Sequence, residues 1–281
     1  MNPTPTTPVT TGMLPVPGAR LHYEVRGQGP LVALVAAPMD ADAFAPLADL
    51  LATDYTVLTT DPRGVHRSIL DDRQQDSTPE LRADDLSRLL SHVDAGPAVV
   101  LGSSGGAMTA LALAQAHPDQ VHTAIAHEPP LVELLADCDQ LHAGTEDIIA
   151  TGLAGDRPGA WRKFLHQANI MLPDEVFDMM FGQPLEARAA ADEQRWFAHE
   201  LRGTTHWRPD VETLRRGATR IVVGIGEESA GQLCDRASRA LASALDTEPT
   251  MFPGDHTGFV GDAGAFATRL RAILHHSVAK P

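Results

Sequence analysis

The sequence has only two cysteines in 281 residues, Cys138 and Cys234, and no apolar run approaches the length of a membrane span. Two distant cysteines exclude a framework of several disulfide bonds and are typical of proteins in the reducing cytoplasm. The Pro/Thr-rich residues 1–12 lack the positive and apolar regions of a signal peptide. We therefore expect a cytoplasmic protein with a disordered leader over residues 1–12.

Basic side chains are also scarce, because 22 Lys and Arg residues stand against 37 Asp and Glu residues and give a formal net charge of −15. Such a charge disfavours nucleic acid and anionic membranes as partners. The sequence has no H-E-x-x-H, C-x-x-C or G-x-x-x-x-G-K motif, so we expect neither a metal nor another cofactor. The expected partner is a small-molecule substrate, and the composition leaves the oligomeric state open.

Short apolar segments alternate with helical ones along most of the chain, which predicts an α/β fold. The expected strands are residues 22–26, 31–35, 56–60, 98–101, 123–127, 221–223 and 248–252. The expected helices are residues 43–51, 79–93, 107–116, 230–245 and 263–275. Strands of this kind form a mostly parallel, doubly wound sheet that helices cover on both faces. The length suits one α/β domain over residues 1–281 with an insertion.

Residues 102–106 read G-S-S-G-G and match the pattern G-x-S-x-G, with Ser104 at its centre. An apolar run precedes this turn and a series of helix formers follows it. Strand, glycine turn and helix in succession are the context of a nucleophile elbow, in which a strained turn exposes the serine hydroxyl. The other interpretation is a Gly/Ser-rich turn that binds an anion or nothing, and the flanking elements favour the elbow.

A serine nucleophile needs a base, and His256 is the candidate among the 13 histidines. It lies in the turn-rich segment P-G-D-H-T-G, directly after the expected strand 248–252. Loops at the carboxyl ends of strands bring functional groups together in open α/β sheets. A lone loop histidine is more often a surface residue, but the order of serine before histidine favours the role of base.

Five segments in this order resemble the α/β-hydrolase fold superfamily. They are residues 18–27, 35–38, 61–68, 102–106 and 253–259. The second takes the place of the family's H-G-x-P loop and the third resembles its D-x-R-G-x-G-x-S turn. The resemblance covers most of the chain. It implies a serine hydrolase that cleaves a small, largely apolar ester, thioester or lactone through an acyl-enzyme, without a cofactor.

Two departures from the family pattern concern the oxyanion loop and the turn after it. The loop reads V-A-A-P, and by position the amide of Ala37 should join that of Gly105 in the oxyanion hole, since Pro38 has no N–H. In the turn 61–68, His66 stands where a glycine is usual. We interpret His66 as a partly exposed surface residue in preference to a catalytic one.

The third member of the triad has two possible places in the family. In the G-x-x-D turn that follows a later strand, this chain reads G-E-E-S, with Ser229 in place of the aspartate. The other place is the end of the strand after the elbow helix, where Glu128 precedes two prolines. A carboxylate there is costly to bury unless a histidine N–H satisfies it. We expect Glu128 as the acid, with Glu228 or Glu227 as the alternative; Glu128 could instead anchor the first cap helix.

Residues 131–205 interrupt the alternation with apolar side chains at helical spacing. This is the place where the family inserts its cap, so we expect an inserted helical cap over the nucleophile. Phe177 and Met180 are the candidates for substrate contact, although packing of the cap is the commoner use of such side chains.

Two other functions remain compatible with the sequence. The altered oxyanion loop and His66 could serve a lyase, cyclase or transferase in a biosynthetic pathway, and the fold also allows a non-enzymatic small-molecule receptor. The joint presence of Ser104, His256 and a glutamate speaks against the receptor, because a binder has no need of all three.

Overall fold

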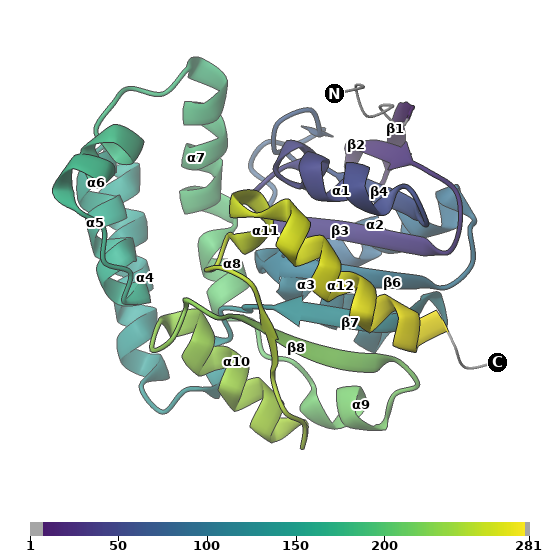
Figure 1. Ribbon diagram of the computed structural model, residues 1–281. Helices are drawn as coiled ribbons and strands as arrows, with labels where there is room; N and C mark the ends of the chain where they lie inside the picture. The colour runs from purple at the N-terminus through teal and green to yellow at the C-terminus, as the bar shows by residue number, and fades with distance from the viewer. Residues whose placement is uncertain (1–7, 279–281) are drawn as a thin grey trace, which may run out of the picture.

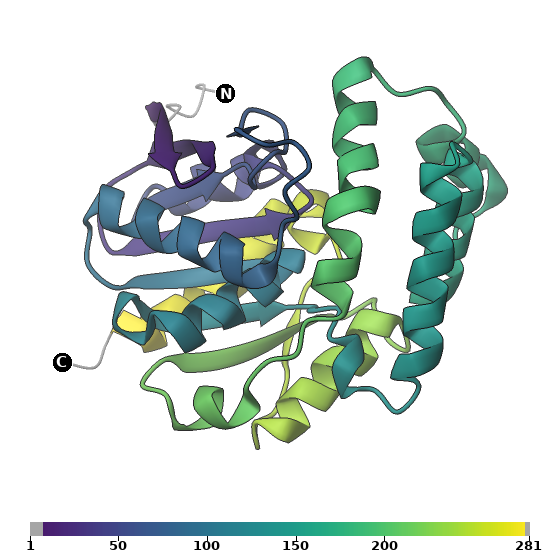
Figure 2. The ribbon, with the colours of Figure 1, turned by 180° about the vertical axis from the view of Figure 1, so that it is seen from behind.

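The computed structural model describes residues 8–278, with side chains up to residue 275. Within these residues, nine strands form one sheet that lies between two layers of helices (Figures 1 and 2). The strands are β1 (Val9–Val16), β2 (Ala19–Arg26), β3 (Leu31–Ala37), β4 (Thr56–Thr60), β5 (Ile69–Leu70), β6 (Ala98–Ser104), β7 (Val121–His127), β8 (Arg220–Gly226) and β9 (Thr250–Phe252). Their order is β1-β2-β4-β3-β6-β7-β8-β9, and β5 pairs with β2.

The α-helices differ in which part of the sheet they cover. They are α1 (Ala45–Leu51), α2 (Pro79–Val93), α3 (Gly105–Ala116), α4 (Cys138–Leu153), α5 (Arg157–Ala168), α6 (Asp174–Phe181), α7 (Ala187–His199), α8 (Leu201–Thr205), α9 (Val211–Arg216), α10 (Leu233–Ala244), α11 (Gly258–Gly261) and α12 (Ala263–Val278). One hydrophobic cluster joins α2, α3 and α10 to the sheet, and a second joins α1, α11 and α12 to its other face.

The centre of the sheet is parallel and buried on both faces. Leu31, Ala33 and Val35 of β3 belong to one of these two clusters, whereas the alternating residues Val32 and Leu34 belong to the other. From β4 to β9 every neighbouring pair of strands is parallel, and only β1, β2 and β5 run antiparallel to their partners. The expected mostly parallel, doubly covered α/β sheet is confirmed, and it brings the carboxyl ends of β3, β6, β7 and β8 to one edge.

The N-terminal segment differs from the expected disordered leader. Strand β1 begins at Val9 and pairs antiparallel with β2 along its whole length. The expectation over residues 1–12 is therefore wrong from residue 9 on, and residues 1–7 lie outside the described residues. The segment is an exposed edge strand, so it lacks the continuous apolar pattern of the central strands and its pairing with β2 orders it.

The segment between β7 and β8 is helical and, in the described chain, contains no strand from residue 131 to 205. Helices α4 to α7 stand together beyond the sheet's edge in both ribbon views (Figures 1 and 2). Their aromatic side chains pack on one another: Trp161 stacks on Trp196 and Phe181, with ring centroids 5.2 and 4.6 Å apart. No helix among the described residues is long and apolar enough to span a membrane.

Helix α7 is fixed by hydrogen bonds to the segment that precedes α2. Arg195 of α7 donates hydrogen bonds to the carbonyl oxygens of Arg73 (3.0 Å) and Gln75 (2.8 Å). The amide of Ser77 donates a 2.8 Å bond to the carbonyl of His199. The hydrogen bonds between the end of α7 and residues 73–77 thus satisfy backbone carbonyl and amide groups of both segments.

Candidate active site

Ser104 is the last residue of β6, and α3 begins at the next residue. Its φ of 55° and ψ of −124° are values that a residue with a side chain rarely adopts. A Cβ atom at Gly106 would collide with the carbonyl oxygen of Val35, and one at Gly102 with that of Gly106. The glycines on both sides of Ser104 therefore allow the strand, the sharp turn and the helix to pack closely.

Ser103, the other serine of the turn, is directed elsewhere. It is buried, and its hydroxyl lies 3.1 Å from Nδ1 of His127. His127 is itself fully buried, with edge-on ring contacts to Phe252 and Phe266. Burial lowers the pKa of His127 to about 4, so this imidazole is neutral at ordinary pH.

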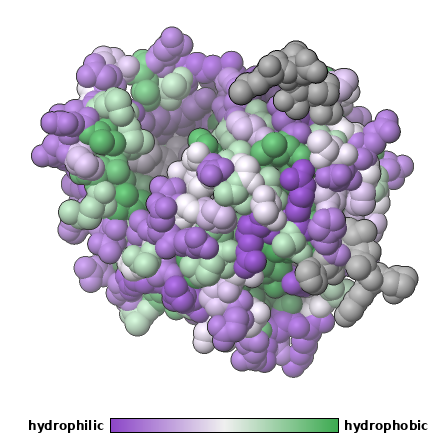
Figure 3. Space-filling view, viewed as in Figure 1, coloured by the Kyte–Doolittle hydropathy of each residue, from purple (hydrophilic) through white to green (hydrophobic). Residues whose placement is uncertain are grey.

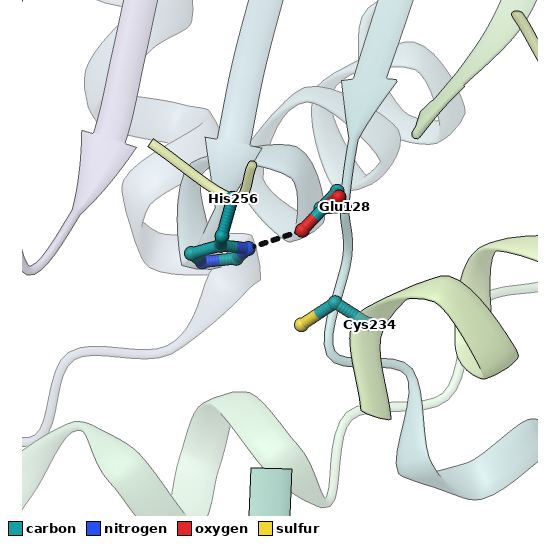
Figure 4. Close-up of side chains that lie close together, drawn as sticks. All are labelled: Glu128, Cys234 and His256. Atoms are coloured by element: carbon teal, nitrogen blue, oxygen red, sulfur yellow. Dashed lines mark hydrogen bonds and ion pairs between the residues drawn. The ribbon is translucent and has the colours of Figure 1, made fainter. Parts of the chain in front are cut away.

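Glu128 and His256 are joined by a short hydrogen bond. Glu128 follows β7 directly, and its Oε2 atom lies 2.6 Å from Nδ1 of His256, which comes from the loop after β9 (Figure 4). The second carboxylate oxygen accepts a 2.8 Å hydrogen bond from the amide of Gly226. The Glu128 side chain is fully buried, and these two partners satisfy both of its oxygens.

The two groups change each other's affinity for protons. Burial raises the pKa of Glu128, but the imidazole of His256 and, more weakly, the hydroxyl of Ser229 bring the pKa below its ordinary value. Burial lowers the pKa of His256, whereas the neighbouring Cys234 and Glu128 raise it, and the net pKa lies above its ordinary value. An ionised carboxylate only accepts, so Nδ1 carries the proton of this bond and Nε2 is the nitrogen left for other chemistry.

The alternative acids lie apart from this bond. Glu227 and Glu228 are exposed, and their amides donate to the carbonyl oxygens of Phe252 and Gly254. Neither carboxylate forms a hydrogen bond with His256 in the described part of the chain. The geometry therefore favours Glu128 as the partner of His256.

Ser104 and the expected oxyanion donors share the edge at which Glu128 lies. Ser103 pairs with His127 in the β6–β7 register, so Ser104 and Glu128 follow at the ends of neighbouring strands. Ala37 pairs with Ser104 in the β3–β6 register, and a Cβ atom on Gly105 would lie 2.7 Å from the carbonyl oxygen of Ala37. Within residues 8–275, no hydrogen bond joins the Ser104 hydroxyl to His256; such bonds often form only when substrate binds.

Cys234 is a residue of this site that the sequence analysis did not single out. It is the second residue of α10, and its sulfur points toward Glu128 and His256 (Figure 4). The ligand atoms of the three side chains lie within 4.8 Å of one another. A signal was present in the sequence, because a helix that follows a parallel strand begins at the same edge where the catalytic groups gather.

His66 lines a large groove, and its side chain is 26% exposed. Its Nδ1 atom is 3.0 Å from Asp40, and its amide donates to Asp192 of α7. The groove has a volume of about 820 Å³ between α7 and residues 64–74, and Ser104 does not line it. A separate view shows the surface hollowed between the inserted helices and the sheet-bearing part (Figure 3).

The two candidate substrate contacts of the insertion lie on α6. Phe177 is buried against Phe181 and beneath the guanidinium of Arg162, whereas Met180 is 51% exposed. Neither takes part in a described interaction with Ser104, Glu128 or His256. Contact of Phe177 and Met180 with a substrate stays a prediction.

Comparison with known proteins decides the family. A relative described as "Uncharacterized hydrolase YraK" of Bacillus subtilis (strain 168) is 34% identical over 275 residues, which cover 95% of this chain and 96% of the relative. A model of the alpha/beta hydrolase fold matches residues 29–156. The chain belongs to the α/β-hydrolase superfamily.

Two further proteins resemble part or most of the chain. A protein described as "Zearalenone hydrolase" of Cladophialophora bantiana is 30% identical over 176 residues, which cover 59% of this chain and 66% of that protein. The structure of a thermophilic esterase from Thermogutta terrifontis superposes with a TM-score of 0.73 at 18% identity, over 95% of this chain and 99% of that one. At such low identity, the structural likeness bears on the fold alone.

Proposed function

We propose that this α/β-hydrolase is a serine hydrolase that cleaves a small, largely apolar ester, thioester or lactone. The observation that carries the proposal is the 2.6 Å bond between Glu128 and His256 at the strand end next to Ser104. An imidazole whose Nδ1–H is held by a buried carboxylate presents Nε2 as a base, as a serine nucleophile requires. The names of the two curated relatives, both called hydrolases, support the same class of reaction.

The reaction would proceed in two halves. The Ser104 hydroxyl attacks the carbonyl carbon while Nε2 of His256 takes its proton, and the amides of Gly105 and Ala37 stabilise the oxyanion. His256 then gives the proton to the departing alcohol or thiol, which leaves an acyl group on Ser104. Water, deprotonated by His256, releases the acid and restores the serine. Glu128 keeps the imidazole in one tautomer and balances its positive charge throughout.

In this proposal, the helices between β7 and β8 act as a cap over the active site. They stand beyond the edge at which Ser104 and Glu128 lie, where a lid would exclude water and select the substrate (Figure 1). The steps above require no cofactor. We place the reaction in the cytoplasm, because Cys138 and Cys234 are both free thiols.

The test combines labelling with turnover. A fluorophosphonate should label the native protein once, and p-nitrophenyl acetate should be hydrolysed; both should be lost in Ser104→Ala. Ser103→Ala is the matched control, because its hydroxyl bonds to His127, and it should still be labelled. Labelling that persists in Ser104→Ala, or a folded native protein that neither reacts nor turns over esters, would overturn the proposal.

A further inference from the structure

Three side chains with different donor atoms converge beside the proposed base. Glu128 follows β7, Cys234 lies in the first turn of α10 and His256 comes from the loop after β9 (Figure 4). Their oxygen, sulfur and nitrogen atoms all lie within 4.8 Å of one another. The known steps of a serine hydrolase use the carboxylate and the imidazole, but they give the sulfur no task.

This donor set suits a zinc ion. Zn²⁺ binds carboxylate, thiolate and imidazole at about 2.0–2.3 Å, and sites with three protein ligands keep a fourth position for water. The three donor atoms lie within 4.8 Å of one another, a spacing at which all three could hold one metal ion. The positive end of the α10 dipole favours negative charge at Cys234. One carboxylate and one thiolate would neutralise a divalent cation in this largely buried place.

A second cluster of possible metal ligands differs from the first in its charged neighbours. Asp40, Asp61 and His66 also gather their donor atoms within 4.8 Å. There, however, the Arg67 guanidinium donates to both oxygens of Asp61, at 2.8 and 3.0 Å. A cation is thus already in place at that carboxylate. At the first cluster no arginine or lysine bonds to Glu128 in the described residues.

We propose that Glu128, Cys234 and His256 form an inhibitory zinc site, which switches off the hydrolase while the metal is bound. The effect on activity rests on the proposed function, whereas binding of the metal does not. The chemistry follows from the imidazole. A metal on Nδ1 requires that the remaining proton of the neutral ring sit on Nε2, so the ring no longer offers the lone pair that must accept the proton of Ser104.

The proton balance of binding is fixed by these groups. The bound state has thiolate and neutral imidazole. Binding therefore releases to solvent every proton that the two groups held before: one from thiol with imidazole or from thiolate with imidazolium, and two from thiol with imidazolium. No oxidant or reductant is involved.

Calorimetry on the chelator-treated full-length protein tests the site. We expect one Zn²⁺ per chain, with one or two protons released, according to the protonation of Cys234 and His256 at the pH used, as judged from buffers of different ionisation enthalpy. Cys234→Ser should weaken zinc binding by about a hundredfold or more, because loss of a group that merely orients a ligand already costs about 10- to 100-fold. Co²⁺ should give a thiolate-to-metal charge-transfer band that Cys234→Ser abolishes.

Matched variants separate this site from others. Cys138→Ser, which changes the other cysteine, and Ser104→Ala, which lacks the nucleophile, should bind zinc as the native protein does. If Cys234→Ser fails to fold by circular dichroism, Cys234→Ala replaces it. Esterase activity of the native protein should fall with added zinc in step with binding and return when a chelator removes the zinc. The activity of Cys234→Ser should fall much less at the same zinc concentrations. The rate of each protein is compared with its own rate without metal.

The outcomes are distinct. No stoichiometric binding by the native protein, or equal affinity in the native protein and Cys234→Ser, would overturn the zinc site. Zinc that binds through Cys234 without slowing hydrolysis would overturn its inhibitory role. If no ester is hydrolysed but one zinc binds through Cys234, the proposed function fails and the metal site stands.

Discussion

The amide of Gly226 donates a 2.8 Å hydrogen bond to Oε1 of Glu128, across two neighbouring strands. Gly226 ends β8, the strand after which many α/β-hydrolases carry their acid, whereas Glu128 follows β7. Ser229, at the position of the missing aspartate, is fully buried, and its hydroxyl adds weakly to the larger effect of His256, which lowers the pKa of Glu128 against the effect of burial. The later strand thus holds in place a carboxylate that the earlier strand supplies.

We expect Glu128→Gln to lower kcat for ester hydrolysis by about 10⁴-fold, because an amide can hold the wrong imidazole tautomer and carries no charge. Steady-state kinetics with a p-nitrophenyl ester measure the loss, and circular dichroism checks the fold. Glu228→Gln is the control, since this exposed side chain does not bond to His256, and it should keep most activity. A large loss in Glu228→Gln and none in Glu128→Gln would move the acid to the later turn.

Replacement of the nucleophile should reveal the strain of its turn. Ser104→Gly is expected to raise the free energy of unfolding by about 1 kcal/mol, because glycine adopts a φ of 55° without strain. Ser103→Gly, in the same strand, should instead lower it, since the hydroxyl bonded to His127 is lost. Urea unfolding followed by circular dichroism compares the two. Equal destabilisation by both changes would show that the turn stores no strain.

The buried His127 should make the protein sensitive to acid. Its pKa is about 4 in the folded chain against 6.5 without burial, so between these values the unfolded chain binds a proton that the folded chain does not. Stability is therefore lost as the pH falls through this window, by about 3 kcal/mol in total from this group. In His127→Gln, unfolding free energies measured from pH 7 to pH 4 should fall less steeply. The exposed His166→Gln should match the native slope.

The raised pKa of His256 predicts the pH profile of turnover. His256 acts as a base only when unprotonated, so kcat/KM should rise with pH above the ordinary histidine range. Cys234 contributes to the rise in pKa, and Cys234→Ser should move the acid limb of the profile to lower pH. Rates are measured with chelator present, and Cys138→Ser is the control. An unmoved limb in Cys234→Ser would contradict the influence of the thiol on His256.

The elements with strong local patterns could be read from the sequence. Helix α2 has the expected bounds, because Thr78 caps it and Pro79 fits its first turn. Strand β1 escaped prediction since its pairing with β2 arises from tertiary contact, and its Pro/Thr-rich sequence has the composition of a flexible segment.

Part of the site could be predicted from the sequence, where a motif or the cost of burying a charged group indicated a residue. Glu128 stood out as a carboxylate after an apolar strand, and the structure joins it to His256. Cys234 has no motif. Its place depends on the turn after β8, whose Glu227 and Glu228 amides bond to the carbonyl oxygens of Phe252 and Gly254. The sequence alone does not give the path of such a turn.

The anchoring of α7 bears on attempts to exchange the inserted helices between relatives. A chimera that replaces residues 131–205 alone would leave the carbonyls of Arg73 and Gln75 and the amide of Ser77 without their present partners. Residues 73–77 lead directly into α2, so the loss of hydrogen-bond partners for these backbone groups would destabilise the start of that helix. The insertion and residues 73–77 therefore form one transferable unit, although some fifty residues separate them along the chain.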